Sequence, residues 1–218
     1  MAMQRCIPAL LCSVITLTLH AASLDLASPD GNVRFQLSTN AEGHLLHSVT
    51  ANGKLRLEPA RAGVIVDGSD LGAGVILGAP LSRRISEVFP WRGNKTSATN
   101  LCQAYEIPVR TQAGVAWTFE VRVFNDGVGF RYRVPGTSTR RIEGESTSWQ
   151  LPRTAKVWFQ TETGAAAYEG AYQSARADQL PREREIRNQK RPVHLGPPAT
   201  VELDRKSTRL NSSHRIRY

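Results

Sequence analysis

Residues 117–134 read WTFEVRVFNDGVGFRYRV, and this stretch decides the fold. From Trp117 to Val123 every second residue is apolar, and the residues between them are polar or charged. The same alternation returns from Val128 to Val134, and the Asn-Asp-Gly between the two halves is typical of a turn. Successive side chains of a strand point to opposite faces, so each half presents one apolar face. The stretch predicts a long antiparallel hairpin whose apolar face needs a second sheet to cover it.

Beyond this hairpin the sequence carries further strand and turn patterns and almost no helical periodicity. Ser28-Pro29-Asp30-Gly31 is typical of a turn, and it leads into residues 32–38, where apolar and polar residues alternate. Asn52-Gly53 is a strong hairpin signal, because both central residues of a type I′ turn need positive φ. The charged stretch from Ser174 to Lys190 is typical of a solvated loop or a short surface helix. Further strand patterns cover residues 146–151, 156–160 and 193–203.

Together these patterns predict an all-β fold, a two-layer antiparallel sandwich from about Leu24 to Leu203. We expect six side chains of the long hairpin in its core: Trp117, Phe119, Val121, Val123, Phe130 and Tyr132.

The formal net charge of +9 over 218 residues raises the question of nucleic-acid binding. Asp204 to Tyr218 contain five basic residues and one acidic residue, so they supply +4 of this charge. The remaining basic residues are scattered, with pairs at Arg83-Arg84 and Arg140-Arg141, and they form no basic stripe interleaved with aromatic residues. We therefore expect no nucleic-acid partner.

The N-terminus has the pattern of a secretory signal peptide. Arg5 supplies the positive charge, Cys6 to Leu19 form a short apolar run, and Ala21-Ala22-Ser23 offer small residues for cleavage. We expect residues 1–23 to be removed; an N-terminal membrane anchor is the alternative. The expected location is the periplasm or the outside of a bacterial cell, with no membrane span in the mature chain.

Cleavage at this point would remove two of the three cysteines, Cys6 and Cys12. The remaining Cys102 could form no internal disulfide, so the mature domain depends on its hydrophobic core. Cys102 lies in a mildly apolar stretch, which favours a buried structural thiol over a nucleophile.

The last fifteen residues, Asp204 to Tyr218, differ in character from the rest. Residues 204–214 resemble the in-frame translation of a widely used sequencing adapter, and they show no periodicity. We therefore expect an artefactual tail from residue 204 to residue 218, unstructured and in contact with nothing, with the native reading frame lost near Leu203.

Several motifs, in order along the chain, resemble the N-terminal domain of glycoside hydrolase family 97. They are Ser28-Pro29-Asp30-Gly31, Asn52-Gly53-Lys54, residues 122–132 of the long hairpin, Tyr168-Glu169-Gly170-Ala171-Tyr172, and residues 195–203. The hairpin motif is the most specific of them. The resemblance spans about Ser28 to Leu203.

The resemblance implies a large β-super-sandwich of the galactose-mutarotase-like type, packed against a catalytic (β/α)₈ barrel. Members of the family are secreted or periplasmic enzymes that hydrolyse α-glucosidic or α-galactosidic bonds, with calcium in the active site. Glycoside hydrolysis needs two carboxyl groups, and in this family the barrel supplies them. A barrel takes about 250 residues, so we expect it to be absent from this sequence.

The same resemblance implies roles for a few residues of this domain. Glu169 is the first candidate to reach the calcium of the intact parent enzyme, and Glu162 is the second. Tyr168 and Tyr172 are candidates to bind substrate by stacking on a sugar, or to fill the domain interface. We expect no catalytic residue here, and no metal bound to the fragment alone.

Two other residues need an interpretation: Asp126 could be mistaken for a catalytic residue, and Trp91 could contact a ligand. Asp126 precedes Gly127 in the turn of the long hairpin, which favours a turn role over a catalytic one. Trp91 in Phe89-Pro90-Trp91-Arg92-Gly93 could stack on a sugar or fill an interface.

The function expected from these observations is that of a carbohydrate-binding and structural domain of a secreted α-glycosidase. Its expected partners are an α-linked oligosaccharide and the missing barrel, and the fragment alone is expected to be inactive. A free-standing secreted β-sandwich that binds polysaccharide or a surface partner is the alternative.

Overall fold

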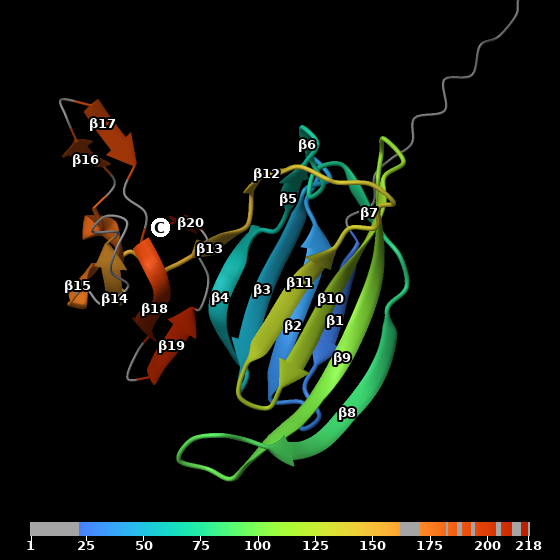
Figure 1. Ribbon diagram of the computed structural model, residues 1–218, viewed down its shortest axis with the longest axis horizontal. Coiled ribbons are helices and arrows are strands. Elements are labelled where there is room, and N and C mark those ends of the chain that lie inside the picture. Colours follow the sequence, from blue (N-terminus) through green and yellow to red (C-terminus); the bar gives the residue numbers. More distant parts are fainter. Residues whose placement is uncertain are drawn as a thin grey trace, which may run out of the picture.

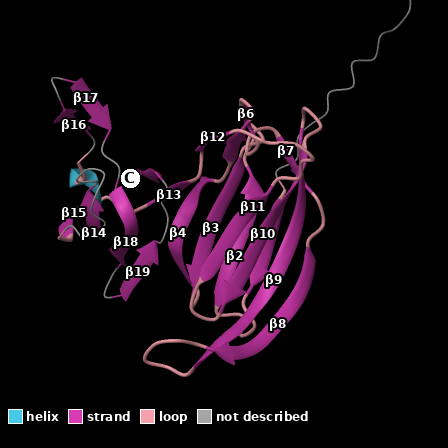
Figure 2. Ribbon diagram, in the orientation of Figure 1, coloured by secondary structure: helices cyan, strands magenta, loops and turns pink. Residues whose placement is uncertain are grey.

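The computed structural model describes residues 22–161, 171–181, 183–186, 189–192, 195–203, 206–210 and 215–217. Almost every element in this part of the chain is a strand (Figure 2), and its single helical element is the short 3-10 turn η1 (Ala177–Gln179). The predicted all-β class is confirmed. The described residues include no helix with the length and apolar character needed to cross a bilayer.

Two mainly antiparallel sheets form the body of the molecule, on the right in Figure 1. The first sheet has the strand order β1-β2-β3-β4-β13-β20. Its strands are β1 (Ser23–Ala27), β2 (Val33–Thr39), β3 (Leu45–Ala51), β4 (Lys54–Arg61), β13 (Ser148–Gln150) and β20 (Arg215–Arg217).

The second sheet has the order β11-β10-β9-β7, and β8 also pairs with β9. Its strands are β7 (Val75–Leu77), β8 (Leu81–Pro90), β9 (Ser97–Thr111), β10 (Ala116–Phe124) and β11 (Val128–Arg133). The hairpin predicted at residues 117–134 is β10–β11, with Val121 opposite Phe130 and Phe119 opposite Tyr132.

The turns form where the sequence predicts them. Asn52 and Gly53 join β3 to β4 with φ of 52° and 70°, the positive values that a type I′ turn requires. In the turn between β1 and β2, the Ser28 hydroxyl donates a hydrogen bond of 2.6 Å to the Asp30 carboxylate. The amide of Val33 in turn donates to the Ser28 hydroxyl at 3.1 Å, which fixes the entry into β2.

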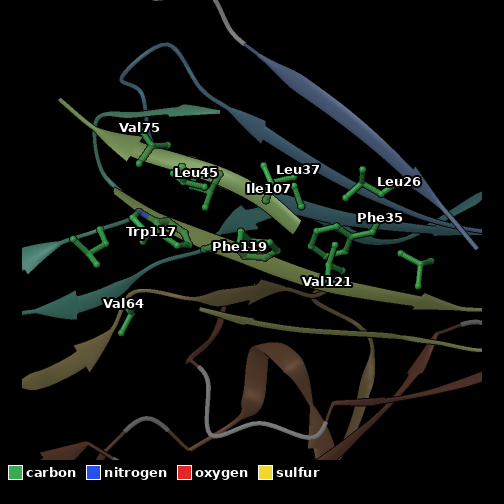
Figure 3. Packing of buried hydrophobic residues seen from close by; sticks show 14 of the residues in the cluster. Leu26, Phe35, Leu37, Leu45, Val64, Val75, Ile107, Trp117, Phe119 and Val121 are labelled. Atoms are coloured by element: carbon green, nitrogen blue, oxygen red, sulfur yellow. The ribbon is translucent and has the colours of Figure 1, made fainter. Parts of the chain in front are cut away.

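The main core lies between the two sheets, where apolar side chains of β2 and β10 face each other (Figure 3). Phe35 of β2 stacks on Phe119 of β10 with ring centroids 5.9 Å apart, and Phe119 stacks on Phe130 at 5.2 Å. The six predicted core residues all belong here. Trp117, Phe119, Val121 and Val123 are buried, whereas Phe130 and Tyr132 are half-buried and pack against them.

The hairpin formed by β8 and β9 extends beyond the sandwich (Figure 1), and we call it the arm, residues 81–106. β10 pairs with β9 only between Cys102 and Arg110. The distal half of the arm therefore has no neighbour on the β10 side, and ten-residue β8 buries only Ile85.

Smaller sheets complete the described chain. Near one end of the sandwich lie β5 (Val64–Val66), β6 (Ser69–Asp70) and β12 (Ile142–Glu145). A separate sheet has the order β15-β14-β18-β19, made of β14 (Lys156–Thr161), β15 (Gln173–Arg176), β18 (Leu195–Leu203) and β19 (Lys206–Leu210). The last pair is β16 (Glu183–Ile186) with β17 (Gln189–Pro192). A second hydrophobic core lies against β14 and includes Val157, Phe159 and Val201.

Two expectations about the C-terminal part are wrong. The described part of the charged stretch from Ser174 to Lys190 is mainly strand: it overlaps β15, β16 and β17, and its helical part is limited to the three residues of η1. The expectation that residues 204–218 are unstructured and in contact with nothing also fails. β19 pairs with β18 over five residue pairs, and β20 pairs in parallel with β13. In both cases the segment is ordered by hydrogen bonds to a neighbouring strand of a sheet. The local sequence pattern of these segments does not reveal this pairing.

Candidate functional site

The segment predicted to carry the site follows the end of β14 and precedes the start of β15 in the sequence. β14 ends at Thr161 and β15 begins at Gln173, and the two strands are antiparallel neighbours. Glu162, Tyr168 and Glu169 lie between these strands but outside the described residues, so their roles stay predictions.

Tyr172 belongs to the described residues and lies directly before the first residue of β15. Its side chain is 49% exposed, which leaves it accessible to a ligand or to another domain. Gln173, the next residue, pairs with Phe159 of β14, whose side chain is buried in the second core. Tyr172 is thus attached to a firmly packed strand pair, and its role in substrate binding stays a prediction.

The described residues include no group of three or more His, Cys, Asp or Glu side chains arranged to hold a metal ion. Calcium takes six to eight oxygen ligands, several of them from carboxylates. The described part of the chain does not by itself provide such a shell.

Three carboxyl groups of the described residues have a lowered pKa. The Ser28 hydroxyl, followed by the amide of Asn32, lowers the pKa of Asp30, and the backbone amide of Arg141 lowers that of Asp67 against partial desolvation. Burial raises the pKa of Glu120, but hydrogen bonds and charge from Arg131 and Arg133 outweigh it. A general acid needs a raised pKa, so none of these three groups is suited to that step.

Asp126 lies in the turn that joins β10 to β11. The amide of Phe124 donates a 2.8 Å hydrogen bond to the carbonyl oxygen of Gly127, which closes this turn around Asp126. The neighbouring Asn125 side chain accepts a hydrogen bond of 3.3 Å from the amide of Asp30, so two of the sequence motifs are in contact. The predicted turn position of Asp126 is confirmed.

Cys102 is buried beside Ile85 and Ala104 at the base of the arm. Burial raises the pKa of its thiol, which keeps the sulfur protonated and unreactive at neutral pH. The predicted structural role is confirmed.

Trp91 lies at the tip of the arm and is 58% exposed. It lines a hollow together with Asn94, Lys95, Ser97 and Thr99. The sequence singled out the tryptophan but not these polar neighbours. The signal available for them was a run of polar residues directly after an aromatic residue.

Comparison with known proteins identifies the chain. The model of the Glycosyl-hydrolase 97 N-terminal domain matches residues 26–211. A probable retaining α-galactosidase of Streptomyces bingchenggensis is 30% identical over 127 residues, which are 58% of this chain and 20% of that protein. The retaining α-galactosidase of Bacteroides thetaiotaomicron is 28% identical over 146 residues, which are 66% of this chain and 21% of that protein. The chain thus spans about a fifth of the length of these relatives.

Solved structures agree on the fold. A glycoside hydrolase family 97 enzyme of Pseudoalteromonas sp. strain K8, in complex with panose, superposes with a TM-score of 0.68 at 17% identity, over 82% of this chain and 26% of that one. A β-arabinopyranosidase superposes with a TM-score of 0.67 at 18% identity, over 82% of this chain and 29% of that one. The long hairpin, the sandwich and the matched range lead to one conclusion: this chain belongs to glycoside hydrolase family 97, of which it represents the N-terminal domain.

Proposed function

We propose that this chain is the carbohydrate-binding and structural N-terminal domain of a secreted α-glycosidase, whose catalytic barrel lies outside this sequence. The observation that carries the proposal is the family match over residues 26–211, on a fold shared with family 97 enzymes. The signal-peptide pattern of residues 1–23 supports export to the periplasm or the medium.

The electrostatics of the domain support a division of labour with a catalytic barrel. Glycoside hydrolysis needs a protonated acid and a second carboxylate on opposite sides of the scissile bond. Asp30, Asp67 and Glu120 have lowered pKa values and stay ionised at neutral pH. They stabilise turns and strand pairs, and the acid and its partner would come from the barrel.

We propose an α-galactoside as the substrate of the intact enzyme, because both curated relatives described above are α-galactosidases. The complexes of the Pseudoalteromonas enzyme with panose and acarbose keep an α-glucoside as the alternative. In either case the sugar ring would be held between the barrel and this domain, with Tyr168 and Tyr172 at the seam.

The calcium of the family would receive one carboxylate from this domain. We assign that role to Glu169 and keep Glu162 as the second choice, since a single carboxylate from a neighbouring domain is a reasonable part of a six- to eight-oxygen shell. Calcium would polarise the substrate and organise the barrel's carboxylates, while this domain would contribute one charge and one wall of the site.

Hydrolysis assays test the proposal. The 218-residue chain and the longer protein encoded at the same locus would be compared on p-nitrophenyl α-galactoside and p-nitrophenyl α-glucoside. We expect turnover only from the longer protein, with the galactoside preferred. Turnover by the 218-residue chain, abolished by changing one of its own carboxylates, would contradict the proposal.

Calcium titration of the longer protein tests the assignment of Glu169. Glu169→Gln keeps the size of the side chain and removes its charge, so calcium affinity and turnover should both fall while thermal unfolding of the metal-free protein is unchanged. Glu162→Gln is the matched control. If only the control weakens calcium binding, the carboxylate is that of Glu162.

A further inference from the structure

The tip of the arm is an ordered turn. β8 and β9 stay paired up to Pro90 and Ser97, and the amide of Trp91 donates a 3.0 Å hydrogen bond to the carbonyl oxygen of Thr96. This bond closes a short loop of residues 92–95 and holds Trp91 at a fixed place on it. The tryptophan is therefore presented by a hydrogen-bonded frame.

The indole ring of Trp91 is packed on one edge and open elsewhere. Phe89 meets it edge to face, with ring centroids 6.1 Å apart. Gly93 has a φ of +145°, which an L side chain rarely adopts, and a Cβ at this position would lie 3.9 Å from Cδ1 and Nε1 of the indole. Glycine thus keeps bulk away from the pyrrole edge, and Trp91 is 58% exposed.

Polar side chains surround the exposed ring. Asn94, Lys95, Ser97 and Thr99 line the same hollow as Trp91. In residues 22–161, which include the whole arm, these four side chains form no hydrogen bond or ion pair with another side chain. The hollow therefore combines an apolar aromatic surface with donors and acceptors that have no partner among the described side chains.

This combination matches the chemistry of a sugar ring. A pyranose has an apolar face of C–H groups, which stacks on an aromatic ring, and a rim of hydroxyl groups, which both donate and accept hydrogen bonds. Asn94, Ser97 and Thr99 could each exchange hydrogen bonds with such hydroxyls. A single exposed apolar residue needs no explanation, but an ordered ring with a polar rim has the composition of a ligand site.

A protein surface fits the hollow less well than a sugar does. Protein interfaces are depleted in lysine, because burying an unpaired ammonium is costly. Lys95 lines the hollow beside Trp91 and forms no ion pair with any other described residue. A sugar would cover the indole while leaving the Lys95 ammonium in water.

We propose that Trp91, with Asn94, Ser97 and Thr99, forms a surface site that binds one sugar unit of an α-linked polysaccharide, at the tip of the arm. The inference rests on the proposed function, since it takes its ligand from the substrate class proposed above. The site would hold the enzyme near its polymeric substrate and take no part in bond cleavage.

Affinity electrophoresis of the 218-residue chain tests this site. Native gels would contain soluble starch, galactomannan with α-linked galactosyl branches, or no polymer. We expect wild-type protein to be retarded in at least one polymer gel, and Trp91→Ala to lose at least tenfold of its apparent affinity. Trp91→Phe should keep part of the retardation, because it retains an aromatic face.

Trp158→Ala is the matched control. Trp158 is also partly exposed, at 38%, but the Lys156 ammonium lies 4.1 Å from its ring centroid, so a cation already occupies that face. We expect this variant to migrate as wild type in every gel. Thermal unfolding of Trp91→Ala should match wild type, because the ring lies outside both main cores.

The affinity gels decide whether the Trp91 site binds sugar, and their result does not depend on the hydrolysis assays that test the proposed function. Absence of retardation in both polymers, or equal retardation of wild type and Trp91→Ala, would overturn the site. Either result would leave the hydrolysis assays of the longer protein as an independent test of the proposed function.

Discussion

The hairpin β10–β11 and the arm β8–β9 are built from the same kind of strand pair and end in different environments. In β10 every second side chain is buried, because the first sheet covers that face. In β8 only Ile85 is buried, and the apolar Val88 is 71% exposed. Alternation therefore predicts a strand, but burial requires a second surface. Where no such surface exists, as at Trp91, apolar side chains are available to a ligand.

The largest loss of stability that would test the contrast between the covered hairpin and the open arm is expected at Phe119. Its ring is fully buried between Phe35 and Phe130, so Phe119→Ala leaves a cavity at the centre of the sandwich. Such truncations cost about 3–5 kcal/mol. Chemical denaturation of wild type and variant would measure the difference in the free energy of unfolding. A loss below about 1 kcal/mol would mean that β10 is not the centre of the core.

The next effect concerns the hydroxyl group of Tyr132 on β11. It accepts a 2.9 Å hydrogen bond from the amide of Gly63 and is also hydrogen-bonded to the Thr147 hydroxyl. Tyr132→Phe removes these bonds from a partly buried site, which costs about 1–2 kcal/mol. Tyr172→Phe is the control, since Tyr172 is exposed and should cost nothing measurable.

The same tyrosine predicts a pH dependence. Burial raises the pKa of Tyr132 above its ordinary value of 10.0, so the folded state keeps the proton that the unfolded state loses. The stabilisation is complete below pH 10 and declines as the pH rises above it. The difference in unfolding free energy between wild type and Tyr132→Phe should therefore shrink above pH 10. A constant difference up to pH 11 would contradict the burial of this hydroxyl.

A smaller effect is expected on the outer, solvated face of the hairpin. Glu120 forms ion pairs with Arg131 and Arg133 across β10 and β11. Its pKa is lowered overall, so its contribution is present above the ordinary value of 4.5 and is lost as the pH falls. Glu120→Gln should cost less than about 1 kcal/mol at pH 7 and less still at pH 3. Glu42→Gln, an exposed site, is the control; equal losses for both variants would contradict the pairing.

The sequence predicted those elements whose local pattern is sufficient to define them. The alternation of residues 117–134 and the paired positive φ of Asn52-Gly53 are local properties, and both features form as expected. β16–β17 and β18–β19 are hairpins between neighbouring strands, but the charged or polar residues of β16, β17 and β19 lack the apolar alternation of a half-buried strand, so their patterns were misinterpreted. β20 pairs with β13, a strand far away in the sequence. Strand pairing outweighed local composition in these segments.

The candidate site was predictable only in part, for a related reason. The exposure of Trp91 follows from the position of the arm, because β10 pairs with β9 only as far as Cys102. No property of residues 89–93 indicates whether a second sheet lies above them. Tyr172 is exposed, but its role, like those of Tyr168, Glu162 and Glu169, still rests on the family resemblance.

The smallest expected effect lies on the arm itself, at Val88. Val88 lies opposite Thr99 in the register of the hairpin and is 71% exposed, so Val88→Ser removes little buried apolar surface. We expect a change in unfolding free energy within about 0.5 kcal/mol, as for other surface substitutions. Ile85→Ala, three residues earlier on the same strand, removes a side chain packed on Cys102 and Ala104 and should cost about 2 kcal/mol or more. Both values come from denaturation curves of the same chain. If Val88→Ser destabilises as strongly as Ile85→Ala, another surface covers the distal arm in solution. The contrast between a covered hairpin and an open arm would then be wrong, and Trp91 would face protein instead of sugar.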